Sequence, residues 1–79
     1  MSQLALVFAD KVRLGHQLIL VRDATLNRGW MTLAAIEAAT GAPQASVSAR
    51  LRELRARGFL VERRRTAPES GLFVYRVSR

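Results

Sequence analysis

Cysteine is absent from this sequence of 79 residues, which excludes a disulfide framework and a thiolate site. Long hydrophobic runs are also missing: the apolar run near the start covers only Leu4 to Ala9, and Asp10 and Lys11 follow it. A membrane-spanning helix needs about 20 apolar residues, and a signal peptide needs a basic segment and a small-residue cleavage site. We therefore expect neither a membrane segment nor a secretory leader, and a cytoplasmic location is favoured.

Groups that could carry out catalysis or bind a metal are scarce. The single histidine, His16, has no other ligand at a useful spacing. Glu53 and Glu62 do not form a convincing acid/base pair, and Ser46 and Ser48 have no adjacent base that would activate a hydroxyl. No glycine-rich phosphate loop is present. The sequence predicts no enzyme, no cofactor, no metal and no small-molecule ligand.

Acidic residues are few and unevenly distributed along the chain. The formal net charge is +7, from twelve arginines and one lysine against six acids. Residues 1–49 have a net charge of +1, whereas residues 50–79 carry nine arginines against three glutamates, a net of +6. This asymmetry indicates a polyanionic partner, such as a nucleic acid, for the C-terminal half. The alternative is that the arginine excess reflects genomic base composition and solubility.

Apolar spacing predicts three helices within one domain. The first is expected over residues 15–27, preceded by a helical or irregular lead-in at residues 1–14, because Gly15 interrupts the pattern. Thr32 is a good N-cap for a short helix over residues 33–40, which Gly41 would close. Pro43 is suited to the first turn of a third helix, over residues 43–57. Two short helices joined by such a short turn are typical of a helix-turn-helix.

The third helix has a clear core-facing side, formed by Val47, Leu51 and Leu54. Two runs rich in β-branched and aromatic residues follow, over residues 59–65 and 72–77, around a loop with proline and glycine. We expect a mostly α fold with a small β-hairpin: three helices followed by two strands. The aromatic side chains are assigned to the core and to hairpin packing: Trp30, Phe59, Phe73 and Tyr75.

The exposed flank of the third helix suits entry into the major groove of B-DNA, because polar or small residues allow close approach to base edges. Glutamine can bind adenine, serine can bind several bases, alanine can contact the thymine methyl group, and arginine can read guanine. The alternative is that these residues are ordinary helix surface. The predicted base-contacting residues are Gln44, Ala45, Ser46, Ser48, Ala49 and Arg52.

Arginines beside this helix and in the hairpin suit contacts to phosphates, which position a protein on DNA without reading sequence. Side chains alternate along a strand, so Arg63 and Arg65 should share one face while Arg64 points to the other. The helix arginines could instead pair with Glu53 or Glu37. The predicted phosphate-contacting residues are Arg50, Arg55, Arg63, Arg64 and Arg65.

The segments "MTLAAIEAATGAPQASVSARLRELRARGFLVERRR" and "GLFVYRV" resemble the winged helix-turn-helix DNA-binding domains of bacterial and phage regulators, with a MarR-like core. The resemblance covers about residues 18–77. It implies that the helix over residues 43–57 enters the major groove and that the wing over residues 64–72 touches the DNA backbone or minor groove. Glu69 at the tip of the wing would be repelled by phosphate, so contacts from the wing's arms are expected instead.

These observations predict a double-stranded DNA-binding protein, a small transcriptional regulator of bacterial or phage origin. The apolar segment Leu4 to Phe8 is a candidate homodimer surface, and folding of this segment back onto its own core is the open alternative. Two rival functions also remain open: an adaptor that binds a protein or nucleoprotein complex on the same scaffold, and RNA binding.

Overall fold

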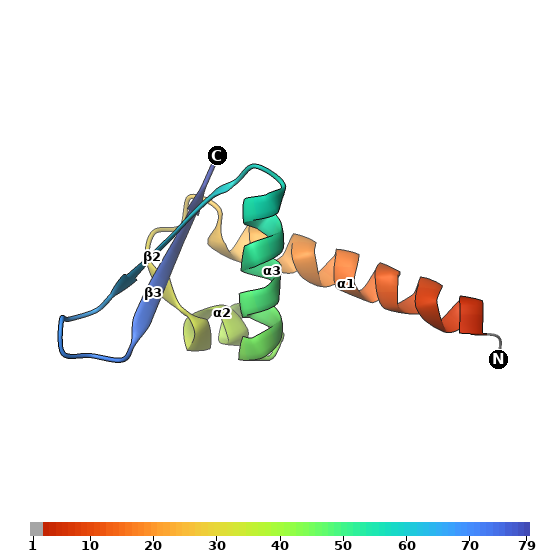
Figure 1. Ribbon diagram of the computed structural model, residues 1–79, viewed down its shortest axis with the longest axis horizontal. Coiled ribbons are helices and arrows are strands. Elements are labelled where there is room, and N and C mark those ends of the chain that lie inside the picture. Colours follow the sequence, from red (N-terminus) through yellow and green to blue (C-terminus); the bar gives the residue numbers. More distant parts are fainter. Residues whose placement is uncertain (1–2) are drawn as a thin grey trace.

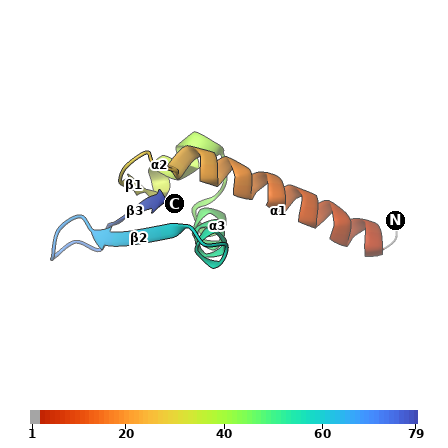
Figure 2. The same cartoon turned by 90° about the horizontal axis from the view of Figure 1, so that it is seen from above.

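A computed structural model of the chain describes residues 3–79, with side chains described from residue 12 onward (Figure 1). The helices pack together, and the long first helix projects from the body toward the N-terminus in both views (Figures 1 and 2). The molecule measures 50 × 24 × 19 Å. Its elements are α1 (Gln3–Thr25), β1 (Met31–Thr32), α2 (Leu33–Thr40), α3 (Gln44–Ala56), β2 (Leu60–Arg65) and β3 (Phe73–Ser78).

Helix α1 is one continuous helix that passes through Gly15, so the lead-in before that residue is helical. It ends at Thr25, two residues earlier than predicted. Asn27 has a left-handed backbone (φ 57°), and its N–H donates a hydrogen bond of 2.9 Å to the carbonyl of Val77. The prediction of a helix end close to Asn27 is therefore confirmed. The chain turns at this residue, and the hydrogen bond links the end of α1 to β3.

The helix-turn-helix segment confirms the predicted caps. The Thr32 side chain accepts a hydrogen bond of 3.0 Å from the N–H of Ala35 at the start of α2. Gly41 ends α2 with a left-handed backbone (φ 76°), which glycine adopts without steric cost. Pro43 stands just before α3 as its N-cap, so α3 begins and ends one residue inside the predicted range. The turn thus directs α3 away from α2 within three residues.

The sheet has three antiparallel strands in the order β1-β3-β2, whereas the sequence predicted two. The hairpin of β2 and β3 is confirmed, and the additional strand β1 pairs Met31 with Tyr75 and Thr32 with Val74. A two-residue strand shows no alternation that a sequence could reveal, so this strand was not predicted. Pairing with β1 makes β3 the central strand of the sheet.

The core joins all three helices to the sheet and leaves one side of α3 uncovered. The predicted inward side of α3 is confirmed, since Val47, Leu51 and Leu54 are buried. Phe59 and Tyr75 pack against the core as partly buried residues. Among the residues described, no helix is both long and apolar enough to cross a membrane. The buried hydrophobic residues are Leu18, Val21, Ile36, Ala42, Val47, Leu51, Leu54, Val61 and Val77.

Candidate nucleic-acid interface

One flank of α3 presents four polar side chains toward the hairpin. Gln44, Ser48, Arg52 and Arg55 follow one another at spacings of four, four and three residues, which places them in a row along one side of a helix. Arg52 Nη1 donates to Ser48 Oγ at 3.3 Å, and Gln44 Nε2 donates to a Glu37 carboxylate oxygen at 3.3 Å. The first bond holds Arg52 along the surface of α3, and the second directs Gln44 toward α2.

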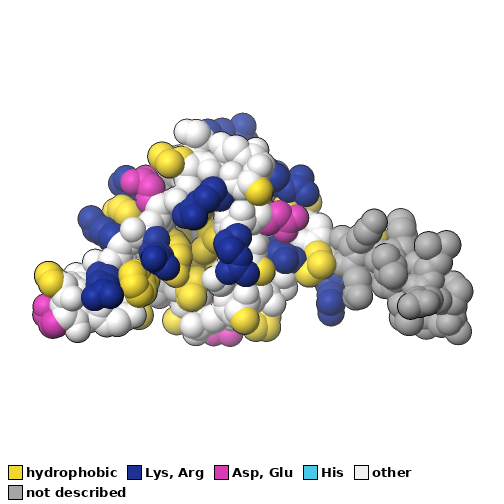
Figure 3. All heavy atoms as spheres, in the orientation of Figure 1, with side chains coloured by type: hydrophobic (Ala, Val, Ile, Leu, Met, Phe, Trp, Pro, Cys, Tyr) yellow, Lys and Arg dark blue, Asp and Glu magenta, His cyan; other side chains and the backbone are white. Residues whose placement is uncertain are grey.

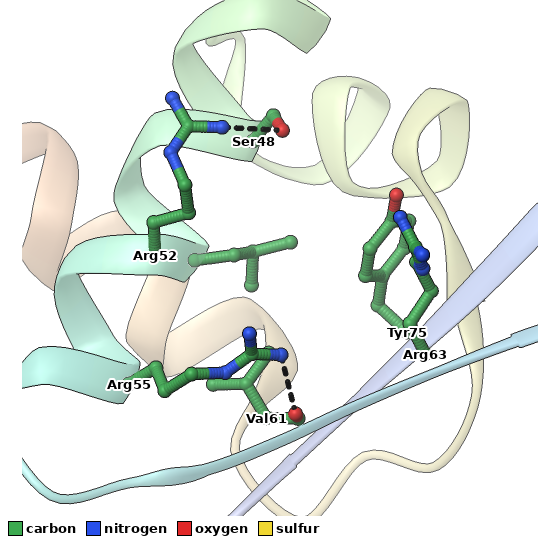
Figure 4. A pocket seen from close by; sticks show the side chains of 7 residues that line it. Ser48, Arg52, Arg55, Val61, Arg63 and Tyr75 are labelled. Atoms are coloured by element: carbon green, nitrogen blue, oxygen red, sulfur yellow. Dashed lines mark hydrogen bonds between the residues drawn. The ribbon is translucent and has the colours of Figure 1, made fainter.

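A pocket of about 280 Å³ lies between this flank of α3 and the hairpin (Figure 4). A second pocket of about 240 Å³ continues it past Gln44 toward the hairpin loop, and Tyr75 lines both. We call the space of these two neighbouring pockets, which share Tyr75 in their lining, the helix–hairpin groove. Buried Leu51 and Val61 line the first pocket, and its polar lining consists of Ser48, Arg52, Arg55, Arg63 and Tyr75.

The hairpin divides its arginines between its two faces, as predicted. The guanidinium groups of Arg63 and Arg65 lie over the ring of Phe73, at 4.6 and 5.6 Å from its centroid. Arg64 lies instead over Trp30, at 4.2 Å, on the face of the sheet turned away from α3. Arg63 and Arg65 therefore share the face that lines the helix–hairpin groove.

Trp30 forms a separate cluster on that outer face. Arg76 stacks on the same ring at 4.6 Å, and it makes a bidentate ion pair with Glu62, at 2.8 and 3.0 Å. Each guanidinium over the ring contributes about 0.5–1 kcal/mol at an exposed site. Trp30 therefore packs against the hairpin, as the sequence predicted, but on the solvent side of the sheet.

Positive charge gathers on the face that contains α3 and β2 (Figure 3). Acidic side chains also lie on this face, some of them beside or between the basic ones (Figure 3). Glu53 of α3 is engaged by Arg50 at 3.3 Å and Arg57 at 3.4 Å, on the flank away from the hairpin. Within residues 12–79, whose side chains are described, no acidic residue lines the groove. The lining of the groove is thus cationic, and the acidic Glu37 lies beside it, bonded to Gln44.

The predicted site residues do not all lie on this surface. Ala45 and Ala49 are on the outward side of α3, next to the groove flank, whereas Ser46 is on the opposite flank, four residues before Arg50. The side chain of Arg50 is only 13% exposed, and its Nε atom is directed to the Glu53 carboxylate at 3.3 Å. Direct contacts of these residues with DNA stay predictions.

Sequence reasoning missed Tyr75 as a groove residue. It was assigned only to packing, because its partner across the hairpin depends on the strand register. The structure pairs Tyr75 with Arg63, so the phenol and the guanidinium stand side by side on one face. Tyr75 could have been assigned to the groove only if the strand register of the hairpin had been known.

Clustered metal ligands are not present among the described residues. These residues contain no group of three or more histidine and acidic side chains that could hold a metal ion. The predicted dimer segment Leu4 to Phe8 lies outside the residues whose side chains are described.

Comparison with known proteins identifies the family of this architecture. A family model described as a winged helix-turn-helix domain matches residues 19–79, which include α2, α3 and the whole sheet. No curated protein and no solved structure matches the chain. The more specific likeness to a MarR-like core stays a prediction. The match covers most of the sequence and agrees with the three helices and the hairpin seen in the structure, and the chain therefore belongs to the winged helix-turn-helix domain family.

Proposed function

We propose that this protein binds double-stranded DNA as a small transcriptional regulator of bacterial or phage origin, acting in the cytoplasm. Membership of the winged helix-turn-helix family supports DNA binding in general. The observation that carries the proposal is the helix–hairpin groove, where arginines from α3 and β2 meet and no described acidic residue lines the space. A polyanion is the partner that such a surface attracts.

In the proposed complex, α3 lies in the major groove. Gln44, Ser48 and Arg52 have the hydrogen-bonding groups that distinguish bases, and Ala45 and Ala49 allow close approach. Arg55, Arg63 and Arg65 then contact phosphates beside the helix. The proposal omits Arg50 because its side chain is largely covered, and Arg64 because it lies on the other face of the hairpin.

A duplex-binding titration at several salt concentrations tests this function. Each neutralised phosphate contributes about 0.9 to the slope of log affinity against log salt, so two to four contacts per chain give a slope magnitude of about 2–4. Single-stranded DNA and duplex RNA of matched length serve as comparisons, and weaker binding to both is expected. Undetectable binding to duplex DNA at low salt would contradict the proposal and favour the adaptor function.

We also propose a homodimer formed through α1. Val12 and Ile19 are 57% and 47% exposed, and their spacing of seven residues places them on one side of the projecting helix. A second copy of α1 would cover these side chains in a symmetric interface. Sedimentation equilibrium should give about twice the 8.8 kDa chain mass for the wild type and a shift toward the monomer for Ile19→Glu. A wild-type mass of one chain at micromolar concentration would contradict the dimer.

A further inference from the structure

We propose that Arg55 and Arg63 bind one and the same phosphate group in the helix–hairpin groove, with the Tyr75 hydroxyl as a third donor. The identity of that phosphate, a phosphodiester of the DNA backbone, rests on the proposed function. The binding chemistry itself does not, because a free phosphate ion would use the same donors.

The Arg55 side chain is anchored on one side of the groove. Its Nη2 donates a hydrogen bond of 2.9 Å to the carbonyl of Val61 at the start of β2 (Figure 4). A guanidinium group has five N–H donors in a fixed fork, so this contact orients the group and leaves most donors for a ligand. The anchor also ties α3 to β2, which fixes the width of the pocket at this point.

The hairpin supplies the opposing wall. Arg63 stacks over the ring of Phe73, which holds the guanidinium without occupying its N–H donors. Its cross-strand partner is Tyr75, whose hydroxyl lies at the same side of the pocket in Figure 4. The Arg52 side chain points along α3 toward Ser48 and away from Arg63 and Tyr75 (Figure 4). Arg52, the residue proposed to read a base, is therefore apart from the proposed phosphate site.

The charge pattern separates these two arginines, like Arg52 in the same pocket, from the ion-paired arginines of residues 12–79. Arg22, Arg50, Arg57 and Arg76 each have a carboxylate within ion-pair distance. Within residues 12–79, whose side chains are described, no ion pair involves Arg55 or Arg63, and both line the same pocket. Apolar Leu51 and Val61 in the lining lower the local polarity and strengthen a charge-assisted hydrogen bond.

The arrangement of a winged helix on DNA explains why a phosphate would arrive there. In the proposed complex α3 occupies the major groove. The hairpin, which lines the same pocket as α3, then lies toward the adjacent minor groove, as the family resemblance implies. The strand that separates these two grooves must then pass between α3 and the hairpin. The pocket with Arg55, Arg63 and Tyr75 occupies this position, and guanidinium groups match phosphate oxygens in bidentate geometry.

A salt-slope cycle on duplex DNA tests whether the phosphate is shared. If both arginines hold one phosphate, Arg55→Gln and Arg63→Gln should each leave the slope nearly unchanged, and the double variant should lower its magnitude by about 0.9. If each arginine holds its own phosphate, each single variant should lower it by about 0.9 and the double by about 1.8, which overturns the proposal. Arg64→Gln, on the other face of the hairpin, provides the matched reference for removal of one charge.

Removal of the phenol oxygen gives a separate readout. Tyr75→Phe should weaken duplex binding by about 2- to 10-fold, since one neutral donor is lost, with no change in the salt slope. An unchanged affinity would exclude Tyr75 from the site. Circular dichroism and thermal unfolding confirm that each variant is folded before its affinity is compared.

Inorganic phosphate tests the site without DNA. In wild-type protein, a phosphate titration at constant ionic strength should shift the Nε–H NMR signals of Arg55 and Arg63 together, with one apparent dissociation constant, and Arg63→Gln should reduce the shift at Arg55. Independent or absent shifts overturn the proposal. If phosphate shifts both signals but the protein does not bind duplex DNA, the phosphate site stands and the proposed function is rejected. If the protein binds duplex DNA but each single arginine variant lowers the salt slope by about 0.9, only the shared phosphate site is rejected.

Discussion

Leu54→Ala is expected to lower the free energy of unfolding by about 2–5 kcal/mol, the range for truncation of a buried leucine. Leu54 is 1% exposed and belongs to the core cluster that α3 shares with the other helices and the sheet. A domain of this length has a total stability of about 4–12 kcal/mol, so the loss would be a large share of it. Urea denaturation followed by circular dichroism measures the change.

Leu60→Ala is the matched control, because it deletes the same atoms. Leu60 is 54% exposed on the outer face of β2, so its truncation removes little buried surface and should cost less than about 1 kcal/mol. Equal losses for the two variants would show that Leu54 is not in a packed core. Leu54→Ala, unlike Leu60→Ala, should also lose apparent affinity for duplex DNA, and the loss should be explained by the fraction of the variant that is unfolded.

The part of this architecture that the sequence predicted best is the part governed by local rules. The period of Val47, Leu51 and Leu54 identified the buried side of α3, because a helix that packs on one side must place apolar residues at that spacing. Thr32 and Gly41 marked the ends of α2 because they satisfy backbone N–H and C=O groups that have no partner within the helix.

Features that depend on distant partners were missed. Strand β1 exists because Met31 and Thr32 meet β3, and nothing within two residues indicates that pairing. The first helix was expected to begin at about Gly15, after a helical or irregular lead-in, yet α1 continues through this residue, since one glycine costs only about 0.5–1 kcal/mol. Such a cost is easily offset by the residues on either side.

In the candidate site, too, features set by local rules were predicted and features set by distant partners were missed. Residue types suited to DNA were recognised on α3 and in the hairpin, and strand alternation separated Arg64 from its neighbours. Charge alone did not reveal that Arg50 lies toward the core side of α3, three residues after Val47, where its long side chain is covered. The role of Tyr75 required the register that pairs it with Arg63.

Ser48→Glu is expected to have the largest effect on DNA binding, a loss of about 100-fold or more in duplex affinity. Ser48 lines the groove, and its Oγ lies 3.3 Å from Arg52 Nη1, so a carboxylate at position 48 would bring a negative charge into the DNA interface and engage the Arg52 guanidinium. Loss of the Arg52 contact alone is worth about 1–3 kcal/mol on a preferred site, and a like charge against phosphate costs several more. Fluorescence anisotropy with a labelled duplex gives the affinity.

The stability of this variant should move in the opposite direction. A glutamate four residues before an arginine stabilises a helix by about 0.2–0.5 kcal/mol, so Ser48→Glu should unfold at an equal or higher urea concentration than the wild type. Loss of binding therefore cannot be assigned to unfolding.

Ala38→Glu provides the matched change of net charge, since Ala38 is an exposed residue of α2 that lines none of the pockets found between described residues. We expect it to weaken binding by less than about tenfold, because a distant exposed charge is screened beyond about 10 Å at moderate salt. Similar losses for Ala38→Glu and Ser48→Glu would mean that net charge alone drives association with DNA. A large loss at position 48 only, in a protein that remains folded, would instead place the DNA against the helix–hairpin groove.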